Sequence, residues 1–131
     1  MTLKTVCALL FLLSMQPVFS SPFDTTLTSF EKGLNAYKSD NYEEAIENFN
    51  IYLKSATMHD EIFYLRGNSY YELNKIEEAV TDYLKANELG YKDEEMFVRL
   101  GKYYKEKKSN TFALQYFQKA VETNKEFAEG F

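Results

Sequence analysis

A fixed spacing of 34 residues runs through most of the chain and constrains its fold more than any other feature of the sequence. Glycine recurs at this spacing, alanine recurs twelve positions later, and an aromatic residue follows each alanine by four positions. The three sets are Gly33, Gly67 and Gly101; Ala45, Ala79 and Ala113; and Phe49, Tyr83 and Phe117. A period of this length is typical of stacked structural repeats, each of which buries its apolar face against its neighbour.

Apolar residues inside each period follow helical spacing in two segments, which are separated by a short polar break such as residues 39–41. No segment shows the sustained alternation or the hairpin turns of β-strands. We therefore predict an all-α protein of about six helices. The helix starts are predicted from two capping boxes, Asn41 with Glu44 and Asn74 with Glu77, and from the N-cap residues Asp60 and Asp93.

The recurring residues resemble the tetratricopeptide repeat, whose pattern is a bulky residue, Leu-Gly, Tyr, Ala, an aromatic residue, Ala and often Pro. The matching residues are Gly33, Tyr42, Ala45 and Phe49; Phe63, Gly67, Tyr70, Ala79, Tyr83 and Ala86; and Phe97, Leu100, Gly101, Tyr104, Ala113, Phe117 and Ala120. Ser29 and Lys32 replace the bulky residue and the leucine of the first repeat, and Thr57, Tyr91 and Lys125 fill the proline position.

The resemblance implies a right-handed α-solenoid of helix-turn-helix repeats. The repeats are expected at about 26–59, 60–93 and 94–127, with the start of a fourth at 128–131. Glycine and alanine are expected where helices cross at close range, because a larger side chain there would cost on the order of 1–3 kcal/mol. The aromatic residues fill the space that the small residues leave.

Residues 1–20 have the composition of a secretory signal peptide. Lys4 precedes an apolar run of about ten residues, and Val18 and Ser20 stand at the −3 and −1 positions of a cleavage site. Cys7, the only cysteine, lies inside this run, so the mature chain is expected to lack thiol chemistry. We expect a cleaved leader at 1–20, a linker at 21–25 and a repeat domain at 26–131, without stable membrane insertion; an uncleaved anchor is the alternative.

The compartment expected from this leader is the bacterial periplasm, with secretion as the alternative. The chain has 20 acidic residues against 15 basic ones, a net charge of −5. Nucleic-acid binding depends on a basic surface that releases counterions. This charge therefore argues against a nucleic-acid partner.

Residues capable of catalysis are few. His59, the only histidine, stands beside Asp60 without a nucleophile or a second metal ligand nearby in sequence, and is expected to be a solvated turn residue. The carboxylate clusters fall in first helical turns, where acids stabilise the helix: Glu43, Glu44 and Glu47; Glu77 and Glu78; Glu94 and Glu95. We expect no enzymatic activity, no cofactor and no metal.

The binding site is expected where the resemblance implies a concave groove, on the first helix of each repeat. By alignment with the family, the groove positions are Phe30, Leu34, Tyr37, Tyr64, Asn68, Tyr71, Val98, Lys102 and Lys105, with Arg99 close by. One end is apolar and the other basic, which suits a peptide or protein with an apolar segment and an acidic end. The alternative is that these lysines form a solvated face and the tyrosines belong partly to the core.

The clamp with which some family members hold the acidic C-terminus of cytosolic heat-shock chaperones is mostly missing. Arg99 stands at a clamp position. Four other positions lack the Lys or Asn of the clamp and carry Phe30, Leu34, Leu65 and Glu95.

Resemblance to periplasmic repeat proteins of envelope assembly favours an exported adaptor or scaffold. Self-assembly is the alternative. Phe131 follows Phe63 and Phe97 at the same spacing, as the bulky position of a fourth repeat. Since solenoids normally end in a polar capping helix, we expect either that the chain is a fragment of a longer protein or that the apolar face of its last helix is covered by another subunit or a partner. A second copy of the chain on that face would make a homo-oligomer.

Overall fold

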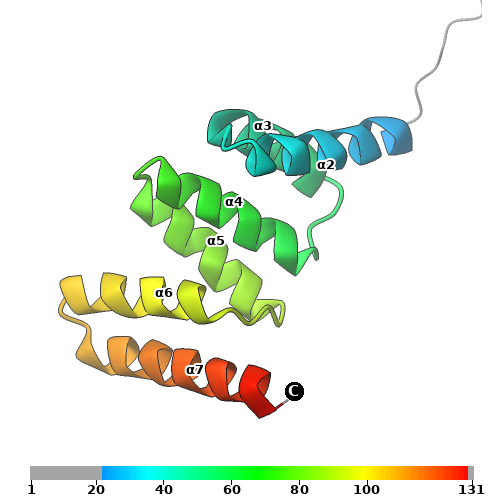
Figure 1. The fold of residues 1–131 in the computed structure, drawn as a ribbon. Coiled ribbons are helices and arrows are strands. Elements are labelled where there is room, and N and C mark those ends of the chain that lie inside the picture. Colours follow the sequence, from blue (N-terminus) through cyan, green and yellow to red (C-terminus); the bar gives the residue numbers. More distant parts are fainter. Residues whose placement is uncertain (1–21, 130–131) are drawn as a thin grey trace, which may run out of the picture.

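The computed structural model describes residues 22–129, which form helices and turns only. The helices are α2 (Pro22–Lys38), α3 (Tyr42–Leu53), α4 (Asp60–Glu72), α5 (Ile76–Glu88), α6 (Glu94–Glu106) and α7 (Asn110–Glu129). Consecutive helices pair as α2 with α3, α4 with α5 and α6 with α7, and the pairs stack in chain order (Figure 1). The predicted all-α solenoid of helical repeats is confirmed.

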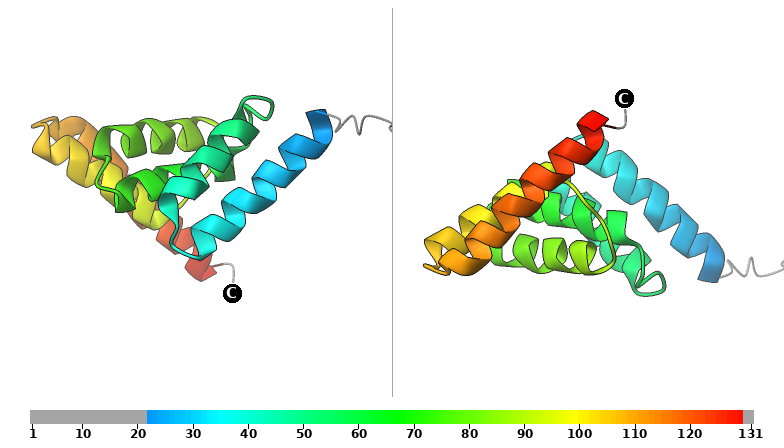
Figure 2. Two further views of the ribbon diagram at one scale, coloured as in Figure 1. Left: turned by 90° about the horizontal axis from the view of Figure 1, so that it is seen from above. Right: turned by 90° about the horizontal axis from the view of Figure 1, so that it is seen from below.

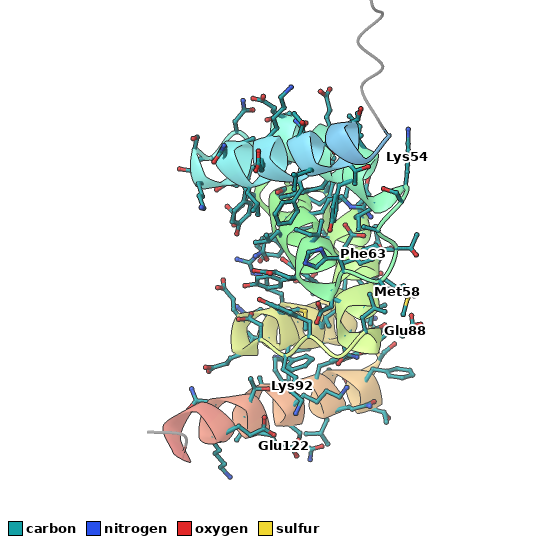
Figure 3. The ribbon with its side chains drawn as sticks, turned by 90° about the vertical axis from the view of Figure 1, so that its right-hand side faces the viewer. Lys54, Met58, Phe63, Glu88, Lys92 and Glu122 are labelled. Carbon is teal, nitrogen blue, oxygen red and sulfur yellow. The ribbon has the colours of Figure 1, made fainter. Side chains whose placement is uncertain are left out.

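Successive helix pairs are rotated relative to one another, so the helices cross when the stack is viewed along its length (Figure 2). The connections between repeats, which contain Met58 and Lys92, lie on one side of the stack (Figure 3). None of the helices in residues 22–129 combines the length and the apolar character needed to cross a membrane.

The small and aromatic residues recur at a fixed spacing because the two helices of each repeat cross at close range, as predicted. A β-carbon added to Gly33, Gly67 or Gly101 would lie 2.6, 2.8 or 2.6 Å from the ring of Phe49, Tyr83 or Phe117, respectively. These distances are too short for any real side chain, so each ring packs directly on glycine. The first two rings are fully buried, at 0% exposure.

The turn inside each repeat uses a left-handed residue, again at a spacing of 34. Asp40, Asn74 and Lys108 have φ angles of 57°, 57° and 59°. The residue after each one donates its backbone N–H to a carbonyl of the preceding helix at 2.8–2.9 Å, which is the hydrogen bond of a Schellman C-cap. Asn74 therefore ends α4, and the capping box predicted from Asn74 and Glu77 is wrong.

Two other predicted helix starts are right to within one residue, but the side-chain caps predicted for them are absent. Asn41 does occupy the N-cap position of α3, but its side chain makes no cap and its amide donates to Glu44 at 2.6 Å. His59, and not Asp60, is the N-cap residue of α4. Asp60 instead accepts from the backbone N–H of Glu61.

The cap predicted at Asp93 is confirmed. Its carboxylate accepts a hydrogen bond from the backbone N–H of Met96 at 2.8 Å and so satisfies one of the free donors at the start of α6.

The N-terminal boundary of the repeat region differs from the prediction, because residues 22–25 are helical where a linker was expected. Pro22 opens α2. Proline is favoured at the first helical position, since it lacks the N–H that would be unsatisfied there. The predicted signal peptide at 1–20 lies outside the described residues.

The last helix also differs, because α7 continues through residues 124–129 where the end of the third repeat and the start of a fourth were expected. Lys125 occupies the proline position, so nothing stops the helix. Two contacts hold the extension to α6 and the turn before it. Lys92 pairs with Glu126 at 3.3 Å, and Asn124 donates to Glu94 at 2.7 Å.

An ion pair joins the two helices of the second repeat where the third repeat has apolar and aromatic side chains. Arg66 and Asp82 correspond to Leu100 and Tyr116 one period later. Two nitrogens of Arg66 donate to the two carboxylate oxygens of Asp82 at 2.7 Å each, and the Asp82 side chain is 5% exposed. Burial raises the pKa of Asp82, although the Arg66 guanidinium lowers it.

Removing one partner of this ion pair should be more damaging than replacing both. Asp82→Ala leaves the Arg66 charge buried without its carboxylate and should lower the free energy of unfolding by about 3 kcal/mol. The double variant Arg66→Leu with Asp82→Tyr places the residue types of Leu100 and Tyr116 at these positions. It should recover most of the stability lost in Asp82→Ala. Urea denaturation followed by circular dichroism measures both. Equal losses would show that the unpaired Arg66 charge is not what destabilises Asp82→Ala.

Candidate functional site

The predicted site residues lie on α2, α4 and α6, the first helix of each repeat, which follow one another through the stack (Figure 1). We call the surface that they form the first-helix face. It comprises Phe30, Leu34, Tyr37, Tyr64, Asn68, Tyr71, Val98, Arg99, Lys102 and Lys105.

The α2 end of the first-helix face is apolar and packed. Phe30, Leu34 and Tyr37 are half-buried and pack against the core cluster of the first repeat. Phe30 contacts Tyr52 and His59, with ring centroids 5.1 and 5.7 Å apart. At this end the face is therefore a continuation of the core.

His59 is not the solvated turn residue that was expected. It is half-buried, its ring stacks on Phe30, and its Nδ1 lies 2.7 Å from the hydroxyl oxygen of Tyr52. Its contacts are those of a residue that anchors the turn between the first two repeats.

The middle of the face carries two tyrosines with different surroundings. Tyr64 is half-buried and stacks on Tyr91 with ring centroids 4.6 Å apart, and burial raises its pKa. Tyr71 lies under Arg99, whose Cζ is 3.9 Å from the Tyr71 ring centroid. This distance places the guanidinium in close cation–π contact.

Asn68 connects all three repeats through its side-chain amide. Its nitrogen donates to the Tyr37 hydroxyl of α2 at 3.2 Å. Its oxygen accepts from the Tyr83 hydroxyl of α5 at 2.7 Å and from Arg99 of α6 at 3.2 Å. Asn68 is 8% exposed, so this polar group is buried with its oxygen and its nitrogen both engaged.

Arg99 is the other centre of this polar network. One terminal nitrogen donates to Tyr83 at 2.8 Å as well as to Asn68, and the other lies 2.6 Å from Glu95 and 3.6 Å from Glu72. Burial acts against the Arg99 charge, but the hydrogen bonds to Tyr83 and Glu95 outweigh it and raise the pKa of Arg99. For Tyr83, burial raises the pKa while Arg99 lowers it, and burial prevails.

The α6 end of the face presents free cations. Lys102 and Lys105 are exposed, and neither makes a salt bridge or a hydrogen bond within the described residues. Val98, half-buried on the same helix, packs against the larger core cluster. Exposed positive charge thus lies at this end of the face, while Arg99 beside it is already paired.

Other polar groups of residues 22–129 offer little for chemistry. No group of three or more His, Cys, Asp or Glu in this part of the chain could hold a metal ion. Glu77, from one of the predicted acidic clusters, accepts from Lys107 at 2.8 Å, and hydrogen bonds from Lys107 and Tyr103 lower its pKa.

A hollow of about 450 Å³ lies between α4 and α5. Its lining includes Phe63 and Glu88, labelled in Figure 3, together with the Arg66 and Asp82 ion pair. Because each of these two charges already has its partner, the hollow is a weaker candidate for binding than the first-helix face.

Three members of the polar network were not identified from the sequence. Tyr83 comes from a second helix, and Glu72 is 27 residues from Arg99. Glu95 is only four residues before Arg99, but its place in the first turn indicated a helix-stabilising acid and not an ion-pair partner. One signal was available: Tyr83 stands where the other repeats have Phe49 and Phe117. A buried tyrosine hydroxyl requires a hydrogen-bond partner, and Asn68 supplies it.

A family model described as a tetratricopeptide repeat matches the chain twice, over residues 30–93 and 64–129. Among solved structures, the fold is similar to that of MamA MSR-1 C2, with 18% identity and a TM-score of 0.65 over 77% of this chain. The aligned part spans 58% of that chain. A comparison with curated proteins gives no match.

Two further similar structures contain ligands. The second tetratricopeptide domain of Spaghetti (RPAP3), bound to the HSP90 peptide SRMEEVD, has 23% identity and a TM-score of 0.62, covering 74% of this chain and 90% of that one. The TPR2B domain of yeast Sti1, in complex with pHsp70, has 18% identity and a TM-score of 0.65, covering 81% and 85%. At these identities the likeness shows the shared fold.

Replacing the Asn68 amide should destabilise the whole stack. Asn68→Leu leaves the Tyr37 and Tyr83 hydroxyls and one Arg99 nitrogen without their shared partner, so we expect the free energy of unfolding to fall by about 2 kcal/mol. Asn35→Leu on the exposed side of α2 is the control and should change stability by less than about 0.5 kcal/mol. Urea denaturation measures both, and similar values for the two variants would refute a central role for Asn68.

Proposed function

Because the chain belongs to the tetratricopeptide repeat family, we propose that it is a non-enzymatic protein–protein interaction module that binds a peptide or protein partner on its first-helix face. The observation that carries this proposal is the exposure of Lys102 and Lys105, which lack ion-pair partners in the part of the chain described. The peptide-bound domain of RPAP3, which has the same fold, supports a peptide as the ligand class.

The proposed partner has an apolar segment and an acidic end. Phe30, Leu34 and Val98 are each only partly covered by the core and offer contact area to the apolar segment. The two lysines attract the acidic end and fix the direction of the ligand. Exposed charges of this kind contribute more to the association rate and to orientation than to affinity.

The proposed setting is outside the cytoplasm, as an adaptor or assembly scaffold of a bacterial envelope. The leader-like composition of residues 1–20 supports export. The proposal for the envelope rests on the resemblance to exported repeat proteins and on the interaction role of this fold.

Self-assembly through α7 is a second candidate, favoured by the exposure of one face of that helix. Leu114 is 60% exposed, whereas Ile46 and Val80, which precede it by two periods and one, are 8% and 7% exposed. Val121 is 55% exposed, whereas the corresponding Leu53 is 7% exposed. A following first helix covers this face in the first two repeats.

A second copy could cover the same face by an antiparallel contact between two α7 helices. The outward side of α2, by contrast, carries exposed Glu31 and Asn35 where α4 has Leu65 and Ser69. An apolar α7 would gain little from this polar surface. The two-fold arrangement is therefore favoured over a head-to-tail filament.

Charge reversal tests the role of the lysines in peptide binding. Peptides that bind the protein, selected from a displayed random library, should be enriched in Asp and Glu. The variant Lys102→Glu with Lys105→Glu should weaken their binding by roughly tenfold. Lys54→Glu with Lys125→Glu changes the net charge equally at exposed positions outside the face and should have little effect. Fluorescence anisotropy gives both affinities, and equal losses in the two variants would refute the assignment.

Sedimentation velocity tests the self-assembly candidate. The protein should form a dimer at micromolar concentration, and Leu114→Lys with Val121→Lys should return it to a monomer, because two charges would be buried in the contact. Ile51→Lys, at a 44% exposed position of α3, serves as the control and should leave the dimer intact. A strictly monomeric parent protein would eliminate this candidate.

A further inference from the structure

The three cations on the α6 part of the first-helix face are in different electrostatic states. Arg99 is 14% exposed as a side chain and has two carboxylates of the chain itself at one terminal nitrogen, those of Glu95 and Glu72 at 2.6 and 3.6 Å. Lys102 and Lys105 are exposed, with no carboxylate within ion-pair distance among the described residues. Only the two lysines therefore carry positive charge that a partner can use.

The second terminal nitrogen and one face of the Arg99 guanidinium are also occupied. Its other terminal nitrogen faces inward, donating to Tyr83 and Asn68. One face of the planar group lies on the Tyr71 ring at 3.9 Å. The Glu95 and Glu72 oxygens thus stand at the outward terminal nitrogen, which a ligand carboxylate would otherwise bind.

The cluster of Arg99, Glu95 and Glu72 joins one guanidinium to two carboxylates and has a formal net charge of −1. The Glu95 and Glu72 side chains are 67% and 44% exposed, so their charges face the solvent from which a ligand arrives. A ligand carboxylate at this point must displace an internal partner and also approach a second negative charge.

We propose that Glu95 and Glu72 are specificity-determining residues of the first-helix face, which keep carboxylates away from Arg99 and so direct the acidic end of a partner to Lys102 and Lys105. This inference rests on the proposed function, because it concerns which peptide the face accepts. Beside Arg99, the accepted peptide carries a neutral or basic residue. The acidic residues follow only at the level of the lysines.

The internal carboxylates compete effectively because they are held close to Arg99. Glu95 is four residues before Arg99 on the same helix, and Glu72 reaches it from α4 of the neighbouring repeat. A tethered group acts at an effective concentration in the millimolar range, above that of a free peptide at micromolar concentration. Each pair on its own is weak, because exposed ion pairs alter an equilibrium by only a few fold.

The test uses the peptide SRMEEVD, which carries several carboxylates, with the exported protein. The variant Glu72→Gln with Glu95→Gln frees Arg99 and should bind the labelled peptide about tenfold more tightly than the parent. The control Glu43→Gln with Glu47→Gln makes the same change in net charge on exposed positions of α3 and should change affinity less than twofold. Fluorescence anisotropy measures the affinities, and circular dichroism confirms that each variant is folded.

Adding Arg99→Gln to the first variant should abolish its gain, which identifies Arg99 as the group that was freed. If that change unfolds the protein, Arg99→Lys in the same background keeps the charge, removes the terminal nitrogen that the two glutamine substitutions free, and should reduce the gain. Equal gains in the two glutamine variants would show an effect of net charge, and no gain in either would show that Glu72 and Glu95 exclude nothing. Either result overturns the inference.

A second set of peptides, selected from the library and dependent on Lys102 and Lys105 for binding, distinguishes a wrong specificity assignment from a wrong proposed function. If these peptides bind every glutamate variant while SRMEEVD gains nothing, the face binds peptides and only the specificity assignment is wrong. If neither kind of peptide binds any variant, the proposed function is wrong and the inference falls with it.

Discussion

Close contact between a glycine and an aromatic ring is the constraint on which the rest of this structure depends. At each of the three crossings, the ring occupies the space in which a β-carbon would lie. The two helices of a repeat come closest where the ring packs on the glycine. This contact fixes how the helices cross and which residues face the next repeat. Since protein interiors are packed like crystals, this crossing also sets the position of every side chain on the first helices.

The polar network follows from one change at this crossing. When Tyr83 replaces phenylalanine, the buried ring brings a hydroxyl that must be hydrogen-bonded, and Asn68 and Arg99 supply its partners. These two residues in turn reach α2, through Tyr37, and the carboxylates of Glu72 and Glu95. A packing residue of the second repeat therefore takes part in positioning Arg99, which lies on a surface formed by all three repeats.

The sequence predicted the fold well because the signals of a repeat are local and occur three times. The spacing of Gly33, Gly67 and Gly101 was sufficient to predict the crossings. Helix boundaries were less predictable: Asn74 is as suitable for an N-cap as for the left-handed position that it occupies. For the first-helix face, the helices and positions could be predicted, and the i, i+4 spacing of Glu95 and Arg99 on one helix made their pairing open to prediction. The pairing of Arg99 with Glu72 could not be predicted, because Glu72 is 27 residues away and its approach depends on how the repeats stack.

This difference between Arg99 and its two lysine neighbours bears on how a repeat surface acquires specificity. Position on a helix determines which side chains can face a partner, and all three cations satisfy that condition. They differ in the carboxylates within reach, since Arg99 is paired with Glu95 of its own helix and with Glu72 of the neighbouring repeat, whereas the two lysines are not paired among the described residues. Under the proposed specificity, changing Glu72 on the adjacent helix is expected to alter ligand preference, while the glycine crossings that maintain the fold stay the same.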